Sequence, residues 1–334
     1  MSGQVNLDGA PLNLKSLRDR SRQDLEDLLD SISAGPKAVV LDEDLTGPVS
    51  LIIEHSALKA RGVQTIYHLL PEMLDVDSSE VVYIVRPRIA LMKLIAQQVT
   101  HKGTQHLRRN FTVVFVPQRS MICEKVLEED GAYDRVRIAE LCLDLIPLDT
   151  DLLSLERSSF TDCHLRSDHA SLAQIARSLI KLQALAGRFG SVRGKGSLAR
   201  VVVDIMTSME QSLRTGAAAH GASAGAVVAG RAAGSLGLDQ SLLLPAGASG
   251  HAESIPPRLV LIDRQVDLVT PMVTQLTYEG LIDEIFGVKH SYVDIDPEVA
   301  TGGPVDPGGQ RAPKIKVALN SNDALYGEVR DLNF

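Results

Sequence analysis

Two carboxylates, Asp42 and Asp44, directly follow the apolar run 38–41. An Asp-x-Asp pair at the end of a buried strand is how some phosphohydrolases hold an aspartate nucleophile, an acid/base and a magnesium ion. The later apolar runs end on arginines instead, namely Arg86, Arg88 and Arg119. Arginines at these positions would pair with the carboxylates and displace the metal. A magnesium-dependent phosphohydrolase that uses Asp42 and Asp44 is therefore kept only as the alternative function.

A second charged group follows the apolar run 259–262, and it could be catalytic or structural. Because close ion pairs shape turns as readily as active sites, we favour a structural role. We expect Asp263 to accept hydrogen bonds from turn amides and Arg264 to pair with a neighbouring carboxylate. A cap and a stop for the following helix complete this structural motif, which comprises Asp263, Arg264, Asp267, Pro271, Thr277 and Gly287.

Two further motifs invite a chemical interpretation but fail on spacing. The glycine-rich segment 187–197 contains Gly194-Lys195-Gly196-Ser197 without the four-residue spacing of a phosphate-binding loop, and it follows a helix. We expect a flexible connection between two helices there. Cys163, His164 and His169 lack a fourth zinc ligand at usable spacing. No metal and no cofactor are expected.

Alternating strands and helices must position the first group of charged residues. Apolar runs predict strands at 38–41, 80–85 and 111–116 and an edge strand at 141–146, with helices between them and before them. This alternation predicts an α/β domain with a parallel, doubly wound sheet, in which the loops after the strands share one rim. We expect the rim to hold Asp42, Asp44, Arg86, Arg88 and Arg119, either as a binding surface or as solvated turn residues.

The second half of the chain predicts helices at 167–186 and 198–213, followed by an Ala/Gly/Ser-rich tract at 215–254. Such a composition buries too little side chain to offset the entropy of ordering, so we expect a disordered insertion. Four consecutive apolar residues at 259–262 predict a strand buried on both faces of a parallel sheet. The apolar residues of 278–286 lie on one face of a helix that we expect to be docked.

Composition and charge narrow the class of protein. The chain has 334 residues and a net charge of −8 without a long basic run, which argues against nucleic acid as the main partner. Its three cysteines have no CxxC spacing, as expected for reduced thiols in the cytosol. No stretch approaches the ~18 apolar residues of a membrane span, so we expect a cytoplasmic protein that reaches membranes through partners.

A family resemblance joins these motifs. The segment 259–288, read with 38–48, 85–88, 115–120 and 143–154, resembles the SM family of SNARE-binding proteins, the Sec-one/Munc-eighteen group. Within that family, three segments resemble the class C vacuolar-sorting branch. They are Asp42-Glu-Asp-Leu-Thr-Gly-Pro48, Val116-Pro-Gln-Arg-Ser120 and Gln275-Leu-Thr-Tyr-Glu-Gly-Leu-Ile-Asp-Glu-Ile-Phe-Gly287.

The resemblance implies a non-enzymatic chaperone of SNARE assembly with an arch-shaped fold. Its partners would be syntaxin-like SNAREs and SNARE bundles, together with vacuolar-sorting partner sixteen and other subunits of the HOPS and CORVET tethering complexes. It would act peripherally on late endosome, lysosome or vacuole membranes. Of the rim residues, the resemblance makes the arginines candidates for contacts with acidic SNARE side chains.

The resemblance also implies a domain division. Residues 1–145 form α/β domain one, residues 146–266 the first part of a second α/β domain, and residues 267–334 the beginning of a mainly helical third domain. Family members continue well beyond this length, so the resemblance implies a chain truncated at Phe334. A sheet without its returning strands would expose edges and apolar surface. We therefore expect the isolated chain to be poorly soluble or to need a partner.

Overall fold

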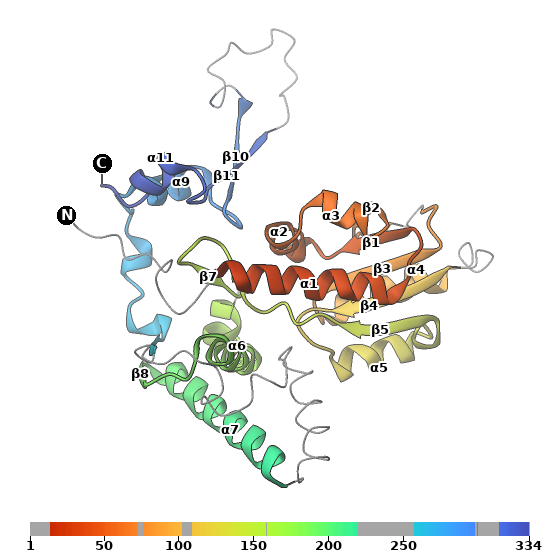
Figure 1. Cartoon of the computed structure of the whole chain (residues 1–334), viewed down its shortest axis with the longest axis horizontal. Coiled ribbons are helices and arrows are strands. Elements are labelled where there is room, and N and C mark those ends of the chain that lie inside the picture. The colour runs from red at the N-terminus through yellow and green to blue at the C-terminus, as the bar shows by residue number, and fades with distance from the viewer. Residues whose placement is uncertain are drawn as a thin grey trace.

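The computed structural model describes residues 14–72, 76–101, 109–157, 159–219, 257–297, 299 and 314–333 (Figure 1). Most of the predicted Ala/Gly/Ser-rich insertion lies outside these residues, but its first five residues, 215–219, form the end of a helix. Within the described ranges, each helix is too short or too polar to cross a bilayer.

A five-stranded parallel sheet forms the first part of the molecule, in the order β2-β1-β3-β4-β5. Its strands are β1 Lys37–Leu41, β2 Val63–His68, β3 Glu80–Val85, β4 Asn110–Phe115 and β5 Val136–Glu140. The doubly wound α/β fold predicted from the alternation is confirmed. Because β2 lies outside β1 and the later strands lie on its other side, the winding reverses between β1 and β3, where such sheets bind their ligands.

The positions of the two edge strands were not predicted correctly from the sequence. β2 was not predicted, and the edge strand expected at 141–146 lies earlier, at Val136–Glu140. Edge strands are covered less fully than central ones, and in β2 only Val63 is buried. Polar residues therefore interrupt the apolar run that would mark each strand. Residues 141–146 instead pack apolar side chains on the sheet as an extended segment.

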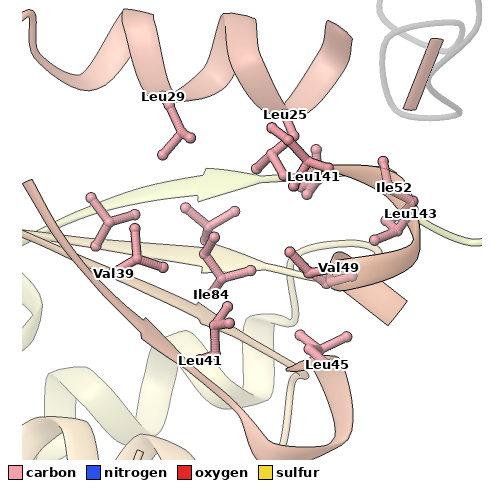
Figure 2. Packing of buried hydrophobic residues seen from close by; sticks show 14 of the residues in the cluster. Leu25, Leu29, Val39, Leu41, Leu45, Val49, Ile52, Ile84, Leu141 and Leu143 are labelled. Atoms are coloured by element: carbon pink, nitrogen blue, oxygen red, sulfur yellow. The ribbon is translucent and has the colours of Figure 1, made fainter. Parts of the chain in front are cut away.

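Helices cover both faces of the sheet. α1 Leu14–Ile32, α2 Glu43–Ile52 and α3 His55–Ala60 lie on one face, and α4 Ile89–Thr100 and α5 Met121–Glu129 lie on the other. Figure 2 shows Leu25 and Leu29 of α1 above Val39 of β1 and Ile84 of β3. Each such fully buried aliphatic side chain contributes about 1.5–3 kcal/mol, so these two cores hold the rim in place.

The second part of the molecule is built on two long helices, α6 Ala170–Ala186 and α7 Ser197–Ala219. Beside them lie two parallel strands, β8 Ser191–Lys195 and β9 Arg258–Ile262. The predicted flexible connection at 187–197 is therefore wrong, because residues 191–195 form β8. Its small and basic residues form a strand because β9 provides the hydrogen-bonding partner, which lies far along the chain.

The strand β9 is parallel, as predicted, but only one of its faces is covered. Leu259 and Leu261 pack on the cluster formed by α6 and α7, whereas Val260 and Ile262 are 62% and 70% exposed. The expectation that this strand is buried on both faces is therefore wrong for the chain as it stands. An apolar run indicates that both faces of a strand can be buried, but burial also requires a neighbouring element that packs on each face.

The last part comprises α9 Tyr278–Phe286, the antiparallel pair β10 Tyr292–Ile295 and β11 Ile315–Ala318, and α11 Ala324–Val329. α9 has the predicted extent, but its apolar face is only partly covered, since Ile285 and Phe286 are 69% and 43% exposed. Two short antiparallel strands, β6 Ile146–Pro147 and β7 Leu153–Ser154, follow β5 in the chain. The loop between them contacts the last part, because Leu148 accepts from the Ser291 hydroxyl and Asp149 pairs with Arg330. The β10–β11 pair extends away from the sheet in Figure 1.

Candidate functional site at the rim of the parallel sheet

Asp42 lies at the carboxyl end of β1 and is 4% exposed. Its Oδ1 accepts a hydrogen bond from the Asp44 amide at 3.3 Å, and its Oδ2 accepts one from the Arg86 amide at 3.2 Å. The first contact caps α2, and the second joins the ends of β1 and β3. A residue that provides an Asx cap and crosses to a neighbouring strand is committed to structure.

Asp44 pairs with Arg88 across the same strand ends. Both side chains are about half exposed, at 50% and 51%. The arginine–carboxylate pairing expected at this rim is therefore present. A solvent-exposed ion pair contributes about 0–1 kcal/mol, so it orients the two side chains more than it stabilises the fold.

Arg86 is buried, with 6% of its surface exposed. Its Nη2 donates to the carbonyl oxygen of Glu156 at 2.9 Å. Burial, followed by the nearby charges of Arg157 and Arg88, lowers the Arg86 pKa to about 10, and the side chain remains charged at neutral pH. The prediction that Arg86 contacts a partner is corrected, because its guanidinium is used inside the molecule. The prediction that Asp42 faces a partner is also corrected, because both oxygens of its carboxylate accept backbone amides inside the molecule.

Arg119 lies at the next strand end and forms its own ion pair. Its Nε and Nη2 donate to the two carboxylate oxygens of Glu124 at 2.9 and 2.8 Å, which lowers the Glu124 pKa. Within the described ranges, no hydrogen bond or ion pair links it to the other four predicted rim residues. The structure thus joins Asp42, Asp44, Arg86 and Arg88 directly, and it places Arg119 beside them at the end of β4.

The sequence did not indicate that a distant segment crosses this rim. Besides accepting from Arg86, Glu156 directs its carboxylate to Nδ1 of His290. The His290 ring lies against Gly47 of α2 so closely that a Cβ at Gly47 would stand 2.1 Å from it. These contacts join residues far apart in the chain, so only the glycine in α2 could have suggested a close approach.

Asp263 organises the second part of the molecule. Its Oδ2 accepts from the Leu198 amide at 3.1 Å and its Oδ1 from the Gln265 amide at 3.1 Å, so one carboxylate caps α7 and holds the turn after β9. Gly196 has a φ of +101°, and a Cβ there would lie 2.2 Å from Asp263 Cβ. The segment 194–197 does lie between a strand and a helix, but Asp263 occupies the position where a phosphate would bind.

The remaining residues of the predicted structural motif are placed around α9. Arg264 donates to the backbone carbonyl of Asp267 at 3.1 Å, and its charge contributes to lowering the pKa of the Asp267 carboxyl. The Asp267 carboxylate accepts from the Thr270 hydroxyl and from two amides, and these contacts lower its pKa. Pro271 lies in a short 3₁₀ turn, Thr277 caps α9 through the Gly280 amide, and Gly287 ends it at a φ of +77°.

The rim geometry does not suit nucleophilic chemistry. Both Asp42 carboxylate oxygens accept backbone amides and are shielded from solvent, and Asp44 is paired with Arg88. Two of the three residues considered for zinc make other contacts. Cys163 Sγ lies 3.2 Å from Ser171 Oγ, and His164 Nε2 lies 3.5 Å from Asp263 Oδ1. What the rim presents to solvent is two arginine–carboxylate ion pairs beside exposed apolar side chains.

Comparison with known proteins gives matches over most of the chain. Residues 37–334 match the model of the Sec1 family. The chain is 39% identical over 333 residues to vacuolar protein sorting-associated protein 33A of Rattus norvegicus, covering 97% of this chain and 50% of that protein. It is 36% identical over 330 residues to the vacuolar protein-sorting-associated protein 33 homolog of Arabidopsis thaliana, covering 98% and 49%.

Solved structures support the fold. The Unc18–syntaxin 1 complex from Monosiga brevicollis matches with a TM-score of 0.59 and 16% identity, covering 95% of this chain and 50% of that chain. The chain spans about half the length of the curated relatives that it matches.

Proposed function

The chain belongs to the Sec1 family, and from this premise we propose that it binds SNARE proteins and promotes their assembly in vesicle trafficking. The family match over residues 37–334 carries the proposal. It is supported by relatives named for vacuolar protein sorting and by a structural neighbour solved with a syntaxin.

We assign the SNARE-facing surface to the solvent-exposed part of the rim. It consists of two arginines and three apolar residues at the starts of α4 and α5, namely Arg88, Ile89, Arg119, Met121 and Ile122. The apolar members are 49%, 87% and 67% exposed. Exposed apolar side chains supply affinity for an amphipathic helix, and the arginines set its orientation and the rate of encounter.

The finer assignments follow the vacuolar-sorting relatives. We propose that the protein works as a subunit of HOPS- or CORVET-type tethering complexes, with vacuolar-sorting partner sixteen as its neighbour. Its site of action would be the late endosome, lysosome or vacuole membrane, reached through these partners. The phosphohydrolase alternative is set aside, because the carboxylate that would attack phosphorus is buried and bonded on both oxygens.

A binding measurement tests the proposal. The chain is immobilised, and binding of a soluble syntaxin-type SNARE and of an assembled SNARE bundle is followed by interferometry. We expect Arg88→Glu combined with Arg119→Glu to weaken binding about tenfold, chiefly through the association rate and more at low salt. Arg200→Glu on α7 is the control, because that side chain is 87% exposed and lies away from the rim.

The possible results separate the function from the surface. If the folded wild-type chain binds no SNARE in either form, the proposed function of this chain is wrong. If it binds and the double reversal leaves both the affinity and the association rate unchanged, the function stands and the rim assignment is wrong.

A further inference from the structure

The β8–β9 pair has an inner face, which packs on α6 and α7, and an outer face toward solvent. Leu259 and Leu261 of β9 point to the inner face. Because side chains alternate along a strand, Arg258, Val260 and Ile262 point to the outer face. All three are exposed, and the exposed fractions of the two aliphatic side chains are 62% and 70%.

The register of the two strands places cations of β8 beside these aliphatic residues. Arg193 is the partner of Val260, and Lys195 is the partner of Ile262. Residues that lie directly opposite each other in a sheet share a face, so both cations belong to the outer face, where both are exposed. The outer face therefore carries an apolar row on β9 and a cationic row on β8, and the two rows are about 5 Å apart.

The cations of the outer face are not neutralised by carboxylates of the described chain. Among the residues that the structure describes, none of Arg193, Lys195 and Arg258 forms an ion pair. The acidic residue next to the face, Asp263, is buried, and its carboxylate accepts backbone amides. Clustered cations without carboxylates, in a chain whose net charge is −8, indicate a partner that is locally acidic.

The spacing along the two rows fits an α-helix that lies along the strands. Residues i and i+2 of a strand are about 6.6 Å apart, and residues i and i+4 of a helix are about 6 Å apart along its axis. Apolar residues at i and i+4 of a partner helix can therefore pack on Val260 and Ile262. Carboxylates on the adjoining flank of the same helix then reach Arg193 and Lys195.

The outer face is less suited to a membrane surface. Segments that bind anionic lipids through charge contain about four to eight clustered cations. This face has only Arg193, Lys195 and Arg258. Elements that lie in the membrane interface also insert large side chains such as Trp, Phe and Leu, whereas the apolar residues here are two β-branched side chains of a strand. A helix is therefore the better match.

We propose that the outer face of the β8–β9 pair is a docking site for an acidic amphipathic helix of another polypeptide. Val260 and Ile262 provide the apolar contact, and Arg193, Lys195 and Arg258 select a helix that carries carboxylates on one flank. The site belongs to a different sheet from the rim, so it does not depend on the function proposed for the rim.

Fluorescence anisotropy with two synthetic peptides tests the site. Each peptide has about 20 residues, long enough to form a helix, with leucine repeated at i and i+4. The two differ only in carrying glutamate or lysine on one flank. We expect the 334-residue chain to bind the glutamate peptide about tenfold more tightly, with a difference that shrinks at high salt. The net charge of −8 would by itself favour the lysine peptide, so general electrostatics cannot produce this preference.

Substitutions at exposed positions separate the contributions of the two rows. Arg193→Glu with Lys195→Glu should reverse the preference between the peptides. Val260→Ser with Ile262→Ser should weaken binding of both peptides and keep the preference. Arg200→Glu is the control and should change neither, because that side chain is 87% exposed on α7, which packs on the inner face. If the charge reversal does not fold, Arg193→Gln with Lys195→Gln decides, since it should remove the preference.

Three results would overturn the proposal. The first is equal binding of the two peptides by the wild-type chain. The second is the absence of saturable binding, which is the result expected if a second copy of the chain holds the face. The third is displacement of the glutamate peptide by vesicles that contain phosphatidylserine, which would assign the face to a membrane surface.

Discussion

At the residue scale, charged side chains at positions typical of active-site groups stabilise the fold through hydrogen bonds. Asp42 joins β1 to β3, and Asp263 joins the turn after β9 to the start of α7. Both lie at strand ends, where α/β enzymes place catalytic groups. In each case the carboxylate oxygens already accept backbone amides of the chain, and this distinguishes a structural aspartate from a catalytic one.

The close approach of Gly196 and Asp263 leads to a stability prediction. Gly196→Ala should lower the free energy of unfolding by about 3 kcal/mol, because the new Cβ meets Asp263 and the backbone is left-handed. Gly131→Ala is the matched control: its φ of +70° is also left-handed, but a Cβ there meets nothing within 4 Å. It should cost only about 1 kcal/mol. Urea unfolding measures both, and equal losses would mean that the contact is unimportant.

A buried ion pair between α6 and residue 144 provides a second prediction. Lys181 Nζ lies 3.2 Å from Asp144 Oδ1, with side chains 5% and 3% exposed. Lys181→Met should lower the free energy of unfolding by about 3–5 kcal/mol, since Asp144 is left buried and unpaired. Breaking the exposed Arg200–Asp204 pair by Arg200→Met should cost less than about 1 kcal/mol. A loss in Lys181→Met as small as the control's would contradict this account.

At the scale of elements, ion pairs tie helices to one another on the outside of the sheet. Glu26 of α1 accepts from Arg22 one turn earlier and from Arg61 at the end of α3. These hydrogen bonds from Arg22 and Arg61 lower the Glu26 pKa. The contact joins two helices on the same face, so its loss should loosen the packing of α1 on the sheet.

This arrangement predicts a pH dependence. The folded pKa of Glu26 lies below its unfolded value of about 4.3, so the contribution to stability is complete above that value and is lost as pH falls through the folded pKa. Glu26→Gln should therefore lower the melting temperature at pH ~7, with a difference from wild type that shrinks on acidification. Glu129→Gln, at an exposed position, should show no such trend. A pH-independent difference would argue against the ion pairs.

At the scale of the whole molecule, apolar surface is concentrated away from the five-stranded sheet. The outer face of β9 and the segment leading to and including α9 expose many large apolar side chains, among them Val260, Ile262, Val269, Met272, Val273, Leu276 and Ile285. An exposed pair of strands with apolar outer residues tends to associate. This exposed apolar surface is therefore where we expect the chain to contact a partner.

We expect the isolated chain to self-associate through this surface. Val260→Lys with Ile262→Lys should shift it toward monomer without lowering its melting temperature, because both side chains already face solvent. Size-exclusion chromatography with light scattering measures the mass over a range of concentrations. Arg193→Lys on β8 is the control variant, since that residue is exposed and the substitution keeps its charge. A wild-type chain that is monodisperse and monomeric at about 0.1 mM would refute this expectation.

The sequence by itself determined the parallel α/β domain, its central strands, the cap and stop of α9 and the family resemblance. These features depend on local apolar periodicity and on turn and capping residues, which act over a few positions. Tertiary structure alone decided that β2 and β8 are strands, that Arg86 is buried and that β9 lacks cover on one face. It also brought Glu156, Arg157 and His290 to the rim. Each of these outcomes depends on a neighbour distant in the chain, and local pattern carries no information about which distant residues will meet.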